Sequence, residues 1–206
     1  MVDSSSSRDY RSGGTYLSVP KKQTKENTSK PKISWVILFY AGWSRVAQLP
    51  RTPDLDAQRA AMKKLGFLAG KWAGEARLLR GPGEPVVLAQ TEEARFKLDG
   101  LILEIEGIGR TKTDNKPVLQ ALGIISFDDE TGTYHMRAFN DGRFLETDVE
   151  LLEDGKSLTW GFALGSIRTS SVLRINEKGE WTELAEITID SQPARKLMEL
   201  TVKRLK

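Results

Sequence analysis

Hydrophobic and polar residues alternate from Gly70 to the end of the chain, in segments of about ten residues. This period of two is typical of β-strands that bury one face. Glycine, asparagine, aspartate and proline gather between the segments at 81–83, 99–100, 114–117, 128–132, 140–142, 154–155, 165, 176–179 and 190–193. Nine turns predict ten strands, and tight turns make successive strands antiparallel neighbours. No helical segment interrupts them, so βαβ folds are excluded.

Ten such strands could form a sandwich or close into a barrel. Closure removes the exposed edges that an open sheet would carry. Two segments collect apolar residues on one face, namely Leu158, Trp160, Phe162 and Leu164, and then Met198, Leu200 and Val202. Other segments, such as 101–108, have mixed faces. A barrel of more than about eight strands is too wide for its side chains to fill. The pattern therefore favours an all-β, ten-stranded antiparallel up-and-down barrel with a lumen.

The barrel is predicted to span residues 66–206, preceded by a linker and short helix at 49–65. Two prolines between positions 49 and 53 break regular structure. Asp54 or Asp56 can cap a helix, and Leu55, Met62 and Leu65 fall near one helical face. A short amphipathic helix should thus precede the first strand.

The N-terminal residues differ in composition from the rest. Residues 1–32 contain seven serines and seven basic residues against three acidic ones, which predicts a disordered basic leader. Residues 33–48 begin with an apolar run that is too short for a membrane span and typical of a signal peptide. The alternative is a buried strand or helix. If residues 33–48 are a signal peptide, the protein is expected to be periplasmic or secreted. If they are not, it is expected to be cytoplasmic.

Charge and composition exclude several functions. Residues 33–206 carry 24 basic and 25 acidic residues, so the basic excess lies in the leader at 1–32. Nucleic acid is therefore not an expected partner of the barrel. The chain has no cysteine and one histidine, which excludes thiolate and multi-histidine metal sites. No G-x-S-x-G elbow, Walker loop or dinucleotide fingerprint occurs. No catalytic residue is predicted.

The segment Gly70-Lys71-Trp72 resembles the G-x-W signature of the calycin superfamily. That resemblance implies that a basic residue of the last strand, here Arg204, packs over Trp72 and closes the barrel by a cation–π contact. The longer patterns at 68–75, 81–85 and 123–142 are similar to uncharacterised bacterial lipocalin-like domains, themselves similar to nitrobindin and haem-binding barrels. The resemblance covers residues 60–206.

Candidate ligand contacts are the aromatic, charged and sulfur-bearing residues of the strands, namely Trp72, His135, Arg137, Trp160, Phe162, Arg168, Trp181, Glu183 and Met198. The resemblance implies that a histidine could ligate haem, although in those barrels it lies late in the chain and 176–206 has none. Arg137 and Arg168 would suit a ligand carboxylate or form exterior ion pairs, and Glu183 could pair with either. We expect the acidic clusters at 92–93 and 128–130 to be solvated.

The sequence thus predicts binding of a small apolar or amphipathic molecule in the lumen, without a cofactor. One alternative is a haem-binding or redox or isomerase-type enzyme centred on His135 and Arg137. Another is a structural or interaction module whose lumen is filled. The sequence leaves the oligomeric state open.

Overall fold

The computed structural model describes residues 51–79, 83–140 and 142–206. The predicted leader at 1–32 and the signal-like segment at 33–48 lie outside the described residues, and both stay predictions. Among the described residues, no helix is long and apolar enough to cross a membrane.

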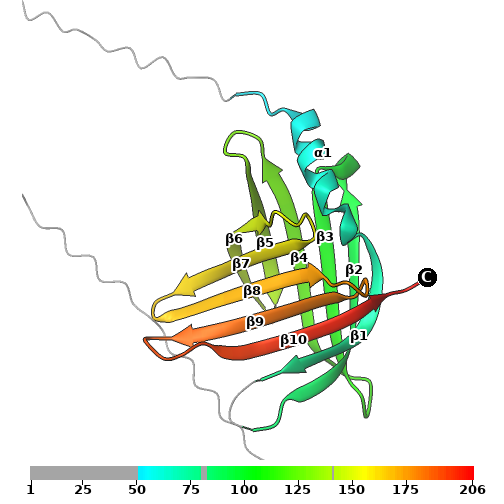
Figure 1. Ribbon diagram of the computed structural model, residues 1–206, viewed down its shortest axis with the longest axis vertical. Helices are drawn as coiled ribbons and strands as arrows, with labels where there is room; N and C mark the ends of the chain where they lie inside the picture. Colours follow the sequence, from blue (N-terminus) through cyan, green and yellow to red (C-terminus); the bar gives the residue numbers. More distant parts are fainter. Residues whose placement is uncertain (1–50, 80–82, 141) are drawn as a thin grey trace, which may run out of the picture. The chain divides into compact units, whose positions relative to one another are not determined.

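Ten antiparallel strands close into one barrel, which confirms the predicted fold (Figure 1). The strands are β1 (Gly70–Leu78), β2 (Val86–Lys97), β3 (Ile102–Thr111), β4 (Pro117–Asp128), β5 (Thr133–Asn140), β6 (Arg143–Leu151), β7 (Ser157–Leu164), β8 (Ile167–Ile175), β9 (Trp181–Ile189) and β10 (Arg195–Arg204). Each strand pairs with the next, and β10 pairs with β1 to close the ring, with Trp72 opposite Arg204. Figure 1 shows β7 to β10 running across β3 and β4.

The connections between strands follow from their turn residues. Gly155 and Gly165 have φ angles of 63° and 59°, a region that favours glycine, and each lies in a tight connection between neighbouring strands. The turns predicted at 154–155 and 165 therefore fall where strands end. A short 3₁₀ turn, η2 (Leu98–Gly100), joins β2 to β3.

The helix α1 (Leu55–Lys63) and the 3₁₀ turn η1 (Lys64–Phe67) cover one end of the barrel. Asp54 caps α1, because its carboxylate accepts hydrogen bonds from the backbone N–H groups of residues 56 and 57. Met62 and Leu65 are fully buried against the barrel. Tyr134 donates a hydrogen bond of 2.7 Å from its Oη to the carbonyl oxygen of Ala61. This contact and the buried side chains hold the helix against β4 and β5.

Packing changes along the barrel axis, as the inner face of β7 shows. Leu158 is 1% exposed, but Phe162 and Leu164 are 37% and 73% exposed. Leu158 follows the β6–β7 connection, whereas Leu164 is the last residue before the β7–β8 hairpin. Gln58 of α1 bonds to Asp129 in the β4–β5 connection, so these connections share the helix-covered end. The opposite end, with the β7–β8 hairpin, is less densely packed, and we call it the mouth.

Candidate ligand-binding site in the lumen

The barrel encloses a cavity of about 250 Å³ with mainly apolar walls. Side chains from β2 to β10 line it, and the apolar ones include Ile105, Leu119, Ile125, Met136, Leu145, Leu158, Trp160, Leu173 and Met198. This volume lies at the small end of ligand pockets, which are typically about 300–1,000 Å³. The cavity would therefore accept a small organic molecule.

Two tryptophans form a layer across the helix-covered end, which we call the floor. The rings of Trp72 and Trp181 meet edge to face, with their centroids 5.7 Å apart, and both side chains are almost fully buried. Trp72 donates a hydrogen bond of 2.8 Å from Nε1 to the carbonyl oxygen of Leu68. Tryptophan is suited to this position because it combines a large apolar surface with a single donor.

Arg204 covers the floor from outside the lumen. Its guanidinium carbon lies 4.1 Å from the centre of the Trp72 ring, within range of a cation–π contact. The same guanidinium donates hydrogen bonds to the carbonyl oxygens of Phe67 and Ala69. Gly70 makes room for it, since a Cβ there would collide with Nη1 of Arg204. Trp72 and Arg204 thus hold the end of η1 against the first and last strands.

A polar cluster lies on the lumen side of the floor. Gln90 and Glu92 point inward from β2, and both are buried, with 3% and 8% of their surface exposed. Gln90 donates a hydrogen bond of 2.7 Å from Nε2 to Oε1 of Glu92. Glu92 lies directly opposite Trp72 in the β1–β2 register. Removal from water raises the pKa of Glu92 to about 8, against the lowering effect of the Gln90 bond.

Glycines on β3 make space for these two side chains. A Cβ on Gly107 would lie 2.7 Å from Oε2 of Glu92, and one on Gly109 would lie 2.6 Å from Oε1 of Gln90. Both distances are shorter than normal carbon–oxygen contacts, so a larger residue would displace the polar groups. The polar cluster therefore requires glycine at positions 107 and 109 of β3.

Glu183 of β9 brings a second carboxyl group to the cavity. Burial raises its pKa to about 7, and its charge contributes to the raised pKa of Glu92. Among the described residues, two buried polar atoms lack a hydrogen-bond partner, Oε1 of Gln90 and Nε1 of Trp181. Buried polar groups are usually satisfied, so these two atoms are exceptions among the described residues.

Four of the residues expected to contact a ligand do line the cavity: Trp160, Trp181, Glu183 and Met198. Trp72 lies in the floor, where Trp181 packs against it. Phe162 is on the inner face of β7 but near the mouth, and it does not line the cavity.

The positions of His135, Arg137 and Arg168 correct the expectation that they contact a lumen ligand. The inward residues of β5 are Tyr134, Met136 and Ala138, so strand alternation sends His135 and Arg137 outward. Nδ1 of His135 lies 2.7 Å from Oδ1 of Asp148, and Arg137 forms an ion pair with Glu146. Both pairs connect residues that lie opposite each other on β5 and β6. A group held in the lumen could not be ligated by His135.

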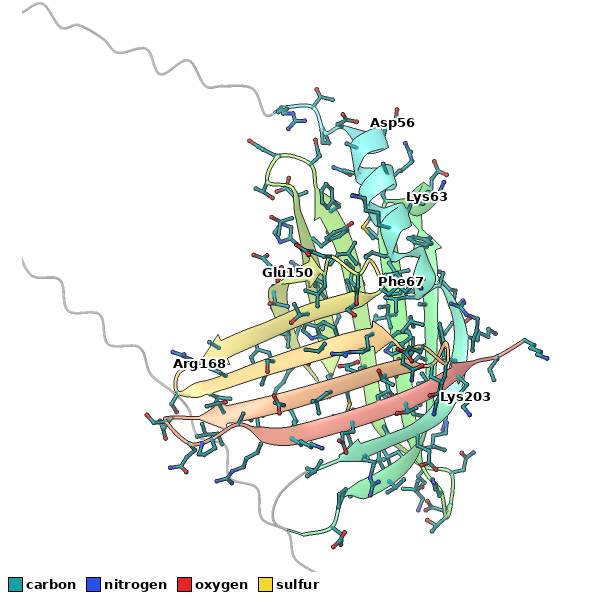
Figure 2. All side chains as sticks on the ribbon, viewed as in Figure 1. Asp56, Lys63, Phe67, Glu150, Arg168 and Lys203 are labelled. Atoms are coloured by element: carbon teal, nitrogen blue, oxygen red, sulfur yellow. The ribbon has the colours of Figure 1, made fainter. Side chains whose placement is uncertain are left out.

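Arg168 is exposed on β8, beside the hairpin that joins β7 to β8 (Figure 2). Neither arginine therefore lines the cavity with Glu183, and the expected arginine–glutamate pair inside the barrel is not formed.

Sequence reasoning missed Gln90 and Glu92. Both acids of the 92–93 pair are expected to be solvated because adjacent strand residues point to opposite faces. The same alternation, however, requires one of the two to point inward. Leu88, Ala94 and Phe96 share the parity of Glu92, whereas Glu93 is on the face of Arg95, with which it forms a 2.9 Å ion pair. The apolar residues on the face of Glu92 were the sequence signal that this face points into the barrel.

Comparisons with known proteins support the fold and assign no family. No protein-family model and no curated protein matches the chain. Among solved structures, the chain resembles the crystal structure of Rv2717c from M. tuberculosis, with a TM-score of 0.54 and 14% sequence identity. The match covers 71% of this chain and 98% of that one. This likeness shows the fold alone, and the calycin resemblance stays a prediction.

Proposed function

We propose that the barrel binds a small molecule with an apolar body and a polar end in its lumen. One observation carries this proposal: the cavity of about 250 Å³ has apolar walls, and two of its lining residues, Gln90 and Trp181, each have a buried polar atom that no described residue satisfies. Apolar cavities with a few convergent polar groups are the usual form of ligand sites.

The packing gradient supports the same proposal. A lumen filled for structural reasons would be packed along its whole length, as protein interiors are. Here the inner face of β7 becomes progressively more exposed towards the mouth. A ligand would enter there, place its polar end at the floor and remove the apolar walls from water.

Titration with 1-octanol tests the proposal on the full-length chain. Binding is followed by the total tryptophan fluorescence, to which Trp160 and Trp181 of the cavity wall contribute. A blocking variant is Ala138→Phe, because Ala138 points into the cavity from β5. Its matched control is Ala89→Phe on the outer face of β2, where Ala89 is exposed. We expect saturable binding by the wild type and by the control, and loss of binding by the blocking variant.

Two outcomes would contradict lumen binding. The first is no saturable signal with octanol or any other probe of similar size, which would favour a filled structural barrel. The second is equal binding by the wild type and Ala138→Phe, which would place the probe on the outer surface. A circular dichroism spectrum and an unfolding curve for each variant establish that the barrel is intact.

A further inference from the structure

Once Glu92 and Glu183 are ionised, the polar groups at the floor are mainly hydrogen-bond acceptors. Glu92 and Glu183 supply four carboxyl oxygens, of which the described residues satisfy one, by the amide of Gln90. Oε1 of Gln90 adds another free acceptor, and Nε1 of Trp181 is the one free buried donor among the described residues. A complementary ligand must therefore bring several donors to this place.

The ionisable side chains among the described residues that line the cavity are both acidic, Glu92 and Glu183. Among the described residues that line it, no lysine, arginine or histidine occurs. The register neighbours of Glu92 are Trp72 and Gly107, and those of Glu183 are Leu173 and Leu200, none of which carries a charge. Charged residues next to these on β8 and β10, Arg174 and Glu199, have the opposite strand parity and face outward. The two acids therefore face the lumen without a compensating cation.

We propose that the floor of the lumen is a binding site for the ammonium group of an amphipathic amine. The ammonium hydrogens would be donated to Glu92, Glu183 and Oε1 of Gln90, while the apolar tail lies along Met136, Trp160 and Met198. A primary ammonium has three donors and one positive charge, which matches an acceptor-rich pocket with two acids. This inference rests on the lumen-binding function and names the substrate class for that site.

Other ligand classes fit the floor less well. A carboxylate, as in a fatty acid, could accept a hydrogen bond from a protonated acid, but no cation lines the described cavity to compensate its own buried charge. A hard metal ion such as Ca²⁺ takes six to eight oxygen ligands. The described residues contain no cluster of three or more acidic, histidine or cysteine side chains that could hold a metal.

Binding of a cation should depend on pH through these acids. The pKa values of Glu92 and Glu183, raised to about 8 and about 7, keep both carboxyls largely protonated below pH 7. An alkylammonium keeps its charge up to about pH 10, as lysine does. It must therefore displace a proton from the pair below pH 7, and its affinity should rise with pH by up to about tenfold per unit between pH 5 and 7.

The test compares three probes with the same tail on the full-length chain: octylamine, 1-octanol and octanoate. Isothermal titration at pH 5, 6, 7 and 8, in two buffers of different ionisation enthalpy, measures affinity and proton release. The variants are Glu92→Gln and Glu183→Gln, and the control is Glu93→Gln, which removes the outward acid of the same strand. These isosteric changes keep an acceptor oxygen at each position.

We expect octylamine to bind most tightly, with proton release and rising affinity from pH 5 to 7. Either lumen variant should weaken octylamine by about tenfold or more and leave octanol within about twofold, while Glu93→Gln changes neither. Octanol binding also shows that each variant is folded. Octylamine binding no tighter than octanol, or unaffected by both lumen variants, would overturn the ammonium site and leave lumen binding intact. Failure of all three probes would contradict the lumen function itself.

Discussion

Replacing Glu92 by glutamine should remove much of a pH dependence from the stability of the barrel. Glu92 is buried at the floor, and burial raises its pKa from 4.5 to about 8. Between these values the folded protein holds a proton that the unfolded chain releases. The free energy of unfolding therefore falls as the pH rises through this window. Glutamine has the same shape and no proton to lose, so its contribution is constant.

The size of the effect follows from the shift. One pKa unit corresponds to about 1.4 kcal/mol, so Glu92 alone should lower the free energy of unfolding by roughly 2–3 kcal/mol between pH 5 and pH 7. Carboxyls with lowered pKa values, such as those of Asp128 and Asp154, act in the opposite sense. Their stabilisation is lost only as the pH falls below about 4.5, outside this window.

Urea unfolding at half-unit intervals from pH 5 to pH 8, followed by tryptophan fluorescence, measures this dependence. The full-length wild type is compared with Glu92→Gln and with Glu93→Gln, whose outward carboxylate pairs with Arg95. We expect the wild type and Glu93→Gln to lose stability in parallel, and Glu92→Gln to become relatively more stable with rising pH. Three parallel curves would instead show that Glu92 is accessible to water and that its pKa is not raised by burial.

Three further predictions test separate parts of the structure. Arg204→Ala should lower the free energy of unfolding by about 1–3 kcal/mol, measured by urea unfolding. It removes the contact with Trp72 and the hydrogen bonds to the carbonyl oxygens of Phe67 and Ala69. An unchanged unfolding midpoint would argue against a role of Arg204 in closing the barrel. Gly74→Ala should lower the free energy of unfolding by at least about 1–3 kcal/mol, because its Cβ would collide with the Thr201 carbonyl oxygen. The control Gly66→Ala has open space around its Cβ and should change that free energy by no more than about 0.5 kcal/mol. Equal effects of the two substitutions would contradict the close approach of β1 to β10. His135→Ala should leave octanol affinity unchanged, because His135 lies on the outer face, and a loss of affinity would contradict that placement.

The strand order was predictable from the sequence because the turns carry their own chemistry. Residues such as Asp154 and Gly155 favour tight connections wherever they occur, so each strand end is marked locally. Barrel closure was favoured because an open sheet of ten strands would carry exposed edges. The helix before the barrel was predictable from Asp54, which caps it in the structure.

The direction in which each strand faces was harder to predict. On β5, the chemistry of His135 and Arg137 suggests lumen roles, but Met136 and Ala138 point inward. Hydrophobic burial, rather than chemical interest, decides the face of a strand. On β2 the same rule buries Glu92 with Leu88, so an acid enters the lumen as part of an otherwise apolar face. The space left by Gly107 is a tertiary feature that no single strand reveals.

A crystal structure of the full-length protein grown with octylamine would show whether the lumen binds an amphipathic amine. We expect the alkyl chain inside the barrel, beside Trp160, with its nitrogen within hydrogen-bond distance of the Glu92 or Glu183 carboxyl group. A lumen that contains only water, or one closed by rearranged side chains with the amine on the outer surface, would contradict it.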